Sequence, residues 1–490
     1  MNKVAQLLSL LCGLSAVANA VDYTAEALAD QVKNLPGAEG LDIKFNQFSG
    51  FIKVNGTKNL HYWFVESIKD PVADPLAFWT NGGPGCSGLL GALTEQGPFR
   101  TENADLTLSL NPSAWNNIAN MVFIEAPVGV GFSYSDEPDG DDYKMDDEET
   151  AQDNYEMIQG FLKRFPHLKT NDMYITSESY GGHYMPTLAK EIVDRNTAGN
   201  DEVLNFKGFF LGNPATTIKS TIPAMLETYW GHQLVSKPTW DSFKENCKTV
   251  KDLEACEMYY FKMYREVGNL NPYALDYPVC LEDKVNGVKR AHGRGQRSFL
   301  LNNFFDALAS QHAEDGTSAT QLTALRKQVG LEPVSGYEPC AGDYMTTYLN
   351  QASVKEALHV TADDKGEWAD CSRSIRYKQS DGMKSMTPYY NYLIDGKFGL
   401  NMVVYSGDDD DVCATVGTQG WIWDLGYEVA GQAWQDYTVN GQTAGYLTKW
   451  KDTGFAFATV RGAGHEVPTY KPEEALWLWQ SYLNGDLTNT

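Results

Sequence analysis

Ser179 lies in the segment YITSESYGGHYMP, residues 174–186, where a run of β-branched and aromatic residues gives way to residues that can start a helix. A nucleophilic serine is presented on a tight turn between a strand and a helix, and small residues two places before and after it let the backbones pass closely. Gly181 fills the second place, and Ser177 fills the first, where the usual pattern has glycine. Ser177 is the poorer candidate because its own flanking residue, Ile175, is too bulky. The segment therefore predicts Ser179 as a nucleophile.

A serine hydroxyl needs a base, and the base needs a carboxylate that orients it. His465 lies in RGAGHEVP, directly after the strand-like run GFAFATV at 454–460. Another such run, NMVVYS at 401–406, is followed by Gly407 and the four aspartates 408–411. Taken singly, the histidine also fits a structural role, and the aspartates fit a solvated loop or a metal site. The chain order serine, aspartate, histidine is that of α/β-hydrolases and favours a catalytic triad.

The sequence WTNGGPGCSG, residues 79–88, follows the strand-like PLAF and contains too much glycine for regular structure. Adjacent glycines let backbone N–H groups point into a cavity, as an oxyanion hole requires. A phosphate-binding loop is excluded because the Gly-Lys-Ser/Thr ending of that motif is absent. This segment is therefore predicted to supply oxyanion donors.

Strand-like runs recur along the chain, with helical patterns between several of them. These runs lie at 118–127, 172–176, 204–214, 401–406 and 454–460, and residues 148–164 have a helical spacing of apolar side chains. Strands that alternate with helices predict a mostly parallel central sheet with helices on both faces. We therefore expect an α/β-hydrolase fold.

Residues 215–335 are richer in charge and in short helical patterns, and they lack comparable strand runs. We expect them to form a largely helical insertion, or cap subdomain, on a catalytic domain made of residues 21–214 and 336–490. The acidic stretch 136–149 lacks the alternation of ligands that an EF-hand needs. It is predicted to be a solvated loop that leads into a helix.

Residues 1–20 carry one early lysine, an apolar stretch and a small-x-small ending, which predict a signal peptide cleaved after Ala20. Removal of Lys3 takes the net charge from −25 to −26. Such a chain repels nucleic acid and anionic membranes, and no later stretch is apolar enough to span a bilayer. We expect a protein of the secretory pathway, located outside the cell or in a vacuole or lysosome.

Seven cysteines remain after this cleavage, so at least one has no partner within the chain. They are Cys86, Cys247, Cys256, Cys280, Cys340, Cys371 and Cys413. Disulfides agree with an oxidising compartment. The sequon at Asn55, with Gly56 and Thr57, predicts a glycosylation site.

Taken together, these motifs resemble the serine carboxypeptidase family over nearly the whole mature chain. The motifs are WTNGGPGCSG, PVGVGFSYS at 127–135, TSESYGGHYMP, the GDDDD segment and GAGHEVP. The resemblance implies Ser179 as nucleophile and His465 as base, and the family pattern Gly-Asp-x-Asp selects Asp410 as the orienting carboxylate. It also implies that the N–H groups of Gly83 and Tyr180 form the oxyanion hole.

The same resemblance implies a set of residues that bind the free carboxylate of a substrate. Asn81 and Glu178 correspond to the family's recognition pair, supported by Glu95 and Trp79. A glutamate that faces a carboxylate is repulsive unless a proton is shared between them, so Glu178 is expected to have a raised pKa. Peptidase activity is then expected to favour acidic pH.

Disulfides, too, follow from the resemblance. It implies the pairs Cys86 with Cys371, Cys280 with Cys340, and Cys247 with Cys256. Cys413 is left over and is expected to be a free thiol that lines the substrate pocket, where a mercurial would inhibit.

The implied activity is release of C-terminal amino acids from peptides or proteins, without a cofactor or a metal. The alternatives are a carboxypeptidase-like acyltransferase and a noncatalytic role as a binding or protective partner of other enzymes. A lipase or esterase would explain the triad but not the carboxylate-binding set. A homodimer is compatible with the resemblance.

Overall fold

The computed structural model of this chain describes residues 22–137, 140–199, 201–246, 253–280, 337–360 and 366–489. Within these ranges, the structure describes the backbone but not the side chains of residues 218–220, 222, 253–258 and 260. The predicted signal peptide at 1–20 and most of the second half of the predicted insertion lie outside the described residues.

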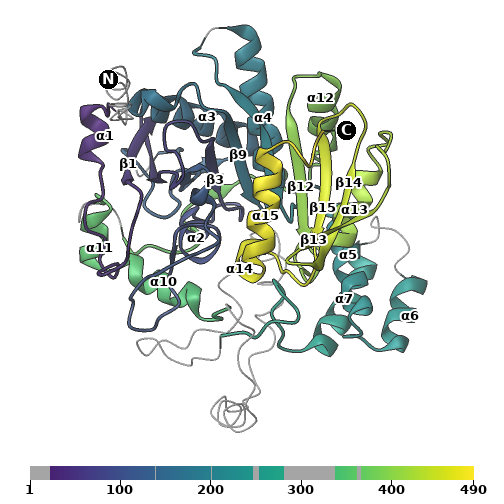
Figure 1. Cartoon of the computed structure of the whole chain (residues 1–490). Coiled ribbons are helices and arrows are strands. Elements are labelled where there is room, and N and C mark those ends of the chain that lie inside the picture. Colours follow the sequence, from purple (N-terminus) through teal and green to yellow (C-terminus); the bar gives the residue numbers. More distant parts are fainter. Residues whose placement is uncertain are drawn as a thin grey trace, which may run out of the picture.

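An 11-stranded sheet forms the centre of the molecule (Figure 1). Ten of its strands follow one another in the order β1 (Gln47–Val54), β2 (Lys58–Val65), β6 (Asn120–Ile124), β3 (Leu76–Thr80), β9 (Met173–Glu178), β10 (Phe206–Gly212), β12 (Asn401–Gly407), β15 (Phe455–Val460), β14 (Gln442–Lys449) and β13 (Gln435–Val439). The eleventh strand, β7 (Tyr134–Ser135), lies off this path and pairs with β2. The six strands from β6 to β15 are mutually parallel, and the strands at both edges are antiparallel. The sheet is therefore mostly parallel at its centre, as expected.

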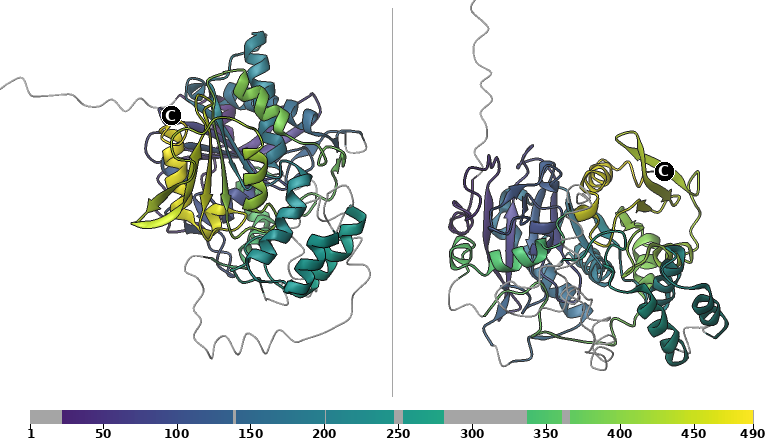
Figure 2. Two further views of the ribbon diagram at one scale, coloured as in Figure 1. Left: turned by 90° about the vertical axis from the view of Figure 1, so that its right-hand side faces the viewer. Right: turned by 90° about the horizontal axis from the view of Figure 1, so that it is seen from below.

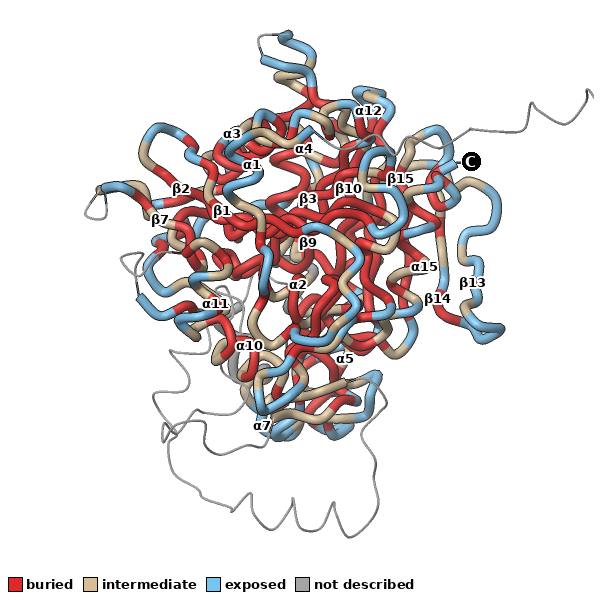
Figure 3. The backbone as a smooth tube through the Cα atoms, turned by 60° about the vertical axis from the view of Figure 1, so that its left-hand side comes forward, coloured by how far each residue is buried: buried red, intermediate tan, exposed pale blue. Residues whose placement is uncertain are grey.

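Side chains alternate between two hydrophobic cores along the central strands. On β9, Ile175 joins the core on one face and Tyr174 the core on the other, and Phe209 and Phe210 divide in the same way on β10. Strands buried on both faces need helices on both faces. Figure 3 shows these strands as the most buried part of the chain.

Helices cover both faces of the sheet. The longer helices that contribute to the first core are α3 (Asp147–Arg164), α4 (Gly181–Ala198), α12 (Thr387–Asp395) and α13 (Thr415–Trp423). Those that contribute to the second core are α2 (Leu89–Thr94), α10 (Ala341–Leu349), α11 (Ala352–Ala357), α14 (Val467–Tyr470) and α15 (Pro472–Leu483). A short helix α1 (Ala25–Ala29) precedes β1, and two small sheets pair β4 (Phe99–Arg100) with β5 (Ser109–Leu110) and β8 (Lys144–Met145) with β11 (Arg376–Tyr377). The α/β-hydrolase fold is thus confirmed.

The acidic stretch before α3 is a helix start, as the sequence predicts. Asp146 caps α3 by accepting a hydrogen bond from the N–H of Glu149. Three acidic residues then occupy the first turn, and Lys163 and Arg164 occupy the last. Both charge placements favour the helix dipole, so this charge pattern stabilises α3.

The predicted insertion contains three described helices, α5 (Ile218–Gly231), α6 (Lys237–Asn246) and α7 (Leu253–Val267). They have a small core of their own, in which Trp230 and Trp240 stack with ring centroids 5.5 Å apart. Helices α6 and α7 lie at the periphery of the molecule in Figure 2, and α5 lies against α13. This separate core agrees with a cap subdomain, whose boundaries at 215 and 335 remain a prediction.

The strands expected from the sequence are present as β6, β9, β10, β12 and β15, and the expected helix is α3. The antiparallel hairpins β1–β2 and β13–β14 were not predicted. Within the described ranges, no helix combines the length and the apolar character needed to cross a bilayer.

A buried lysine joins the sheet to α3. Lys58 on β2 has a side chain only 1% exposed, and its ammonium group lies 2.7 Å from Asp153 and 2.6 Å from Glu149. By contrast, Lys53 on β1 pairs with Asp136 at 2.7 Å, but both of these side chains are largely exposed. The two lysines therefore make similar ion pairs in different surroundings.

We predict that Lys58→Met destabilises the protein by about 3–5 kcal/mol, because it leaves the buried carboxylate of Asp153 without its counter-charge. Lys53→Met is the matched control and is expected to cost less than about 1 kcal/mol, because water solvates the remaining carboxylate. Urea unfolding followed by tryptophan fluorescence measures both changes. Equal losses for the two variants would contradict the role given to the Lys58 ion pair.

Candidate active site

Ser179 occupies the turn between β9 and α4 with a left-handed φ of 59°. Its N–H donates to the carbonyl of Gly212 at 3.1 Å, and its own carbonyl accepts from the N–H groups of Gly182 at 2.9 Å and Ala215 at 2.8 Å. A side chain in this conformation is strained unless its surroundings hold it. These bonds fix the turn, which has the geometry expected for a nucleophile.

The small residues around Ser179 are required by close packing. A Cβ atom on Gly181 would overlap the side chain of Ser177, and one on Gly182 would overlap the carbonyl of Ala215. Ser177, which replaces the usual glycine, is buried, and its hydroxyl donates to the carbonyl of Thr80 at 2.6 Å. The departure from the family pattern is therefore accommodated by a hydrogen bond to β3.

Asp410 follows β12 and accepts four hydrogen bonds. The donors are Nδ1 of His465 at 2.7 Å, Nδ2 of Asn213 at 2.8 Å, and the N–H groups of Val412 at 2.7 Å and Cys413 at 3.1 Å. The carboxylate is completely buried, so these donors replace water as its partners. They also fix its orientation toward the histidine.

Only one of the four consecutive aspartates contacts His465. Asp408 accepts the N–H of Gly462, and Asp409 accepts the N–H of Asp276 at 3.0 Å. The geometry therefore agrees with the choice of Asp410 made from the family pattern.

His465 follows β15 and is held through both its backbone and its ring. Its N–H donates to the carbonyl of Tyr273 at 2.6 Å, and the Tyr273 ring packs edge-on against the imidazole with centroids 5.1 Å apart. The other ring nitrogen, Nε2, is buried and has no hydrogen-bond partner among the described residues. With Nδ1–H donated to Asp410, Nε2 is the nitrogen that can accept a proton.

The electrostatic surroundings of His465 act in opposite directions. Burial alone lowers the pKa of this imidazole, but the nearby charges of Asp410 and Glu466 outweigh that effect, and the pKa is raised above its usual value of 6.5. The imidazolium that forms when the base accepts a proton is therefore stabilised by its neighbours.

The glycine-rich segment after β3 lies against the Ser179 turn. A Cβ atom on Gly82 would lie 2.7 Å from the carbonyl oxygen of Glu178 and 2.8 Å from Cβ of Ser179. In the part of the chain that the structure describes, the N–H groups of Gly83 and Tyr180 donate to no protein acceptor. Both predicted oxyanion donors therefore belong to segments adjoining the nucleophile and remain available to a ligand.

The residues predicted to bind a carboxylate form one buried network. Nδ2 of Asn81 donates to Glu95 at 2.8 Å and to Glu178 at 2.9 Å, and Oδ1 of Asn81 accepts from the Trp79 indole N–H at 2.7 Å. Each of these side chains is at most 4% exposed. Trp79 has no exposed surface, so it orients Asn81 rather than presenting a surface of its own.

The carboxyl groups of Glu95 and Glu178 also act on each other, and two carboxylates so close repel each other unless one of them holds a proton. Burial, followed by the charge of Glu466, raises the pKa of Glu95 to about 7. Burial, and then the charges of Glu95 and Glu466, raise the pKa of Glu178 well above 4.5. The raised pKa expected for Glu178 is confirmed in direction.

Two of the three disulfides implied by the resemblance are present, Cys86–Cys371 and Cys280–Cys340. The first anchors the glycine-rich segment next to Ser179. The third pair includes Cys247, which lies outside the described residues.

Cys413 is free and buried, and burial, followed by the charges of Asp410 and Glu178, raises the pKa of its thiol well above 9. Its contact with substrate remains a prediction.

Three residues of the site were missed from the sequence. Asn213 follows β10, bonds to Asp410 and accepts the N–H of Gly407 at 2.9 Å. Tyr273 belongs to the predicted insertion, and Glu466 adds its charge to the buried glutamates. The only signal for Asn213 was a polar residue at the carboxyl end of a predicted strand, where ligands gather in parallel sheets.

The sequon residue Asn55 is exposed in the turn between β1 and β2, and its glycosylation stays a prediction.

Comparisons with known proteins agree with this geometry. The model of the family described as serine carboxypeptidase matches residues 36–485. Serine carboxypeptidase-like 33 of Arabidopsis thaliana is 37% identical, over 98% of this chain and 96% of that protein. Serine carboxypeptidase 24 of the same plant is 35% identical, over 93% and 92%.

Among solved structures, the prohormone-processing carboxypeptidase Kex1Δp of Saccharomyces cerevisiae has the same fold. The TM-score is 0.70 at 20% sequence identity, and the match covers 94% of this chain and 96% of that one. From the family match over nearly the whole chain and the relatives above 30% identity, this protein belongs to the serine carboxypeptidase family.

Proposed function

We propose that this protein is a serine-type carboxypeptidase that releases C-terminal amino acids from peptides through an acyl-enzyme on Ser179. The observation that carries this proposal is the buried network of Asn81, Glu95 and Glu178, because Glu178 directly precedes the nucleophile. A shared proton lets this network donate hydrogen bonds to a substrate carboxylate. It would thereby hold the last peptide bond of a substrate next to Ser179.

In the proposed reaction, Nε2 of His465 takes the proton of Ser179 as its hydroxyl oxygen attacks the last peptide carbonyl. The N–H groups of Gly83 and Tyr180 stabilise the resulting oxyanion. His465 then gives the proton to the leaving amino group, and the C–N bond breaks to leave the acyl-enzyme. A water molecule, activated by the same histidine, hydrolyses the ester and restores Ser179.

An acyltransferase with the same triad is the alternative. That reaction also uses an acyl-enzyme, but it has no need to recognise a peptide carboxylate. Burying three polar side chains in one network costs desolvation free energy, and a transferase would gain nothing in return because it does not bind a peptide carboxylate. The network therefore favours the peptidase.

We also propose that the protein works in the secretory pathway, outside the cell or in a vacuole or lysosome. The two disulfides in the described residues support an oxidising compartment. The predicted signal peptide and the exposed position of Asn55 point the same way.

The proposed activity predicts a large preference for a free C-terminus. We expect an N-blocked dipeptide to be cleaved with a kcat/KM about 10- to 100-fold above that of its C-terminal amide, because the amide loses charge-assisted hydrogen bonds to the network. Amino-acid release at about pH 5 and pH 7 measures both rates. Ser179→Ala serves as the control and is expected to lose about 10⁴-fold or more. Equal cleavage of acid and amide would argue against carboxylate recognition, and an active Ser179→Ala would argue against the mechanism.

The buried glutamates predict a pH dependence of substrate binding. As the pH rises through about 7, Glu95 loses its proton, and the buried network gains a negative charge that repels the carboxylate of the substrate. The KM of the free-acid substrate is then expected to rise, whereas the KM of the amide stays flat. At lower pH, kcat falls as His465 becomes protonated, since its pKa is raised.

The matched variant for this pH dependence is Glu95→Gln, which keeps the shape and removes the carboxyl group whose pKa is raised to about 7. Its KM for the free acid is expected to depend less on pH between about 6 and 8 than that of the parent protein. KM values from initial rates across this range provide the measurement. An unchanged alkaline rise in Glu95→Gln would assign that rise to another group.

The aspartate run supplies a test within a single loop. Asp410→Asn is expected to lower kcat by about 10⁴-fold, because the amide does not hold His465 in the tautomer with Nε2 free. Asp408→Asn, two residues earlier, is expected to keep kcat within about threefold, because the hydrogen bond of its carboxylate within the described residues is to the backbone N–H of Gly462 and not to His465. Steady-state kinetics of the two purified variants decide the assignment. A similar loss of kcat in both variants would contradict the assignment of Asp410 as the carboxylate that orients His465.

A further inference from the structure

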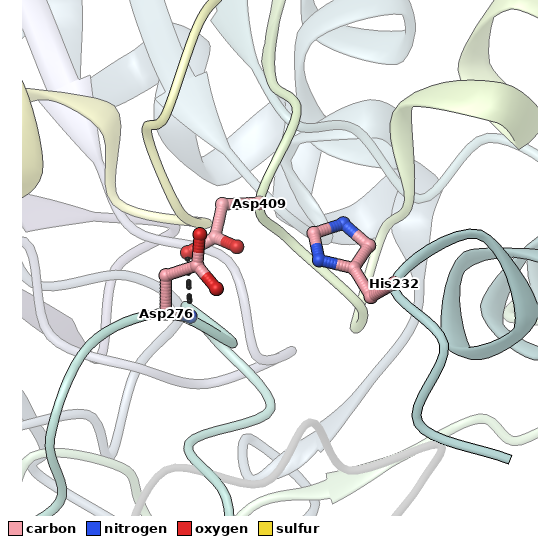
Figure 4. A group of neighbouring side chains, drawn as sticks. All are labelled: His232, Asp276 and Asp409. Carbon is pink, nitrogen blue, oxygen red and sulfur yellow. Dashed lines mark hydrogen bonds between the residues drawn. The ribbon is translucent and has the colours of Figure 1, made fainter.

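A second cluster of polar side chains lies beside the catalytic loop and takes no part in the reaction described above. It consists of His232, directly after α5, Asp276, and Asp409, the residue before Asp410. One ligand atom from each of the three side chains lies within 4.8 Å of the other two. Figure 4 shows the imidazole of His232 facing the two carboxylates from the opposite side.

Asp409 is held rigidly, and one of its oxygens is left without a partner. Its carbonyl accepts the N–H of Leu275 at 3.1 Å, and its Oδ2 accepts the N–H of Asp276 at 3.0 Å. The residue is only 2% exposed, and Oδ1 has no hydrogen-bond partner among the described residues. In Figure 4, this free oxygen points toward His232. A buried carboxylate oxygen of this kind is costly unless a ligand satisfies it.

Asp409 lies among other carboxylates. Those of Asp276, Asp408 and Asp410 each disfavour a negative charge on it, and Arg461 acts on Asp408 in the same loop. Among the described residues, no lysine or arginine forms an ion pair with Asp276 or Asp409. A cation between the two carboxylates would relieve this repulsion and satisfy the free oxygen together.

The donor set selects the class of cation. One imidazole nitrogen and two carboxylate oxygens are typical ligands of Zn²⁺ and related transition metals, whereas Ca²⁺ and Mg²⁺ prefer oxygen alone. Tetrahedral Zn²⁺ with bonds of about 2.0–2.2 Å places its ligand atoms about 3.4 Å apart. Ligand atoms that lie up to 4.8 Å apart therefore need to approach by up to about 1.4 Å, which exposed Asp276 can do by rotating.

We propose that His232, Asp276 and Asp409 bind one Zn²⁺ ion or a similar divalent transition metal, with a water molecule as the fourth ligand. This proposal departs from the sequence-based expectation of a protein without a metal. Such an ion would join the end of α5, the segment that leads to Cys280 and the loop that carries Asp410. It would be a structural clamp between the predicted insertion and the catalytic loop.

The test is zinc binding to the untagged, chelator-treated full-length mature protein at pH 7, with ZnCl₂ as the probe. Isothermal titration calorimetry is expected to give one site per chain, and the melting temperature is expected to rise with added zinc. His232→Ala and Asp276→Asn are each expected to weaken binding by at least about tenfold, since even loss of a residue that only supports a ligand costs that much. Both effects are measured without any substrate, so they are independent of the proposed peptidase activity.

Matched controls separate this site from general loss of charge. Glu227→Ala removes an exposed acid on α5, and Asp436→Asn removes one on β13, and both are expected to bind zinc as the parent protein does. Asp276→Asn keeps the backbone N–H that bonds to Asp409, so it tests the site if His232→Ala folds poorly. Undiminished binding in Asp276→Asn, no zinc binding at all, or binding of CaCl₂ in place of ZnCl₂ would each overturn the proposal.

Discussion

Asp410 accepts hydrogen bonds from three separate loops, and the catalytic geometry depends on that convergence. His465 comes from the loop after β15, Asn213 from the loop after β10, and Cys413 from the loop of Asp410 itself after β12. These strands are adjacent and parallel, so their carboxyl ends meet at one edge of the sheet. Each charge-assisted bond contributes about 1.5–3 kcal/mol, but only when the strands keep their register. The sheet is therefore what makes a buried carboxylate tolerable next to a buried imidazole.

The same burial that strengthens the triad creates opposing protonation requirements across the site. His465 must be neutral to act as a base, and its raised pKa makes that harder as the pH falls. Glu95 and Glu178 must share a proton to receive a carboxylate, and that becomes harder as the pH rises. Glu466 acts on both sides, because its charge raises the pKa of the imidazole and of both glutamates. The single carboxyl group of Glu466 thus shifts the working pH range of the base and of the binding network in the same direction.

The sequence was sufficient for the parts of the fold that follow from local patterns. The central strands and α3 were predicted because apolar periodicity and capping act over a few residues, and β9 with its Ser179 turn carries both signals. The edge hairpins were missed because their polar alternation is weak. Asn213 and Tyr273 were missed for another reason: each acts on Asp410 or His465 through contacts between residues far apart in the chain. Asn81, Glu95 and Glu178 were assigned to one binding site through family resemblance, since no local pattern reports that residues so far apart in the chain meet. The interaction between the two glutamates was not predicted.

The run of aspartates from 408 to 411 explains why residue type alone does not identify a catalytic acid. Successive side chains in this loop point in different directions, so neighbours one residue apart meet different partners. Asp410 meets four donors, whereas Asp409 meets one backbone N–H and keeps a free oxygen beside Asp276. Because these two carboxylates share one short stretch of backbone, a change in the charge around Asp409 must be felt at Asp410. The proposed cation would lower the negative potential on one side of the loop while His465 does so on the other, and the acidic loop between them would then carry far less uncompensated charge.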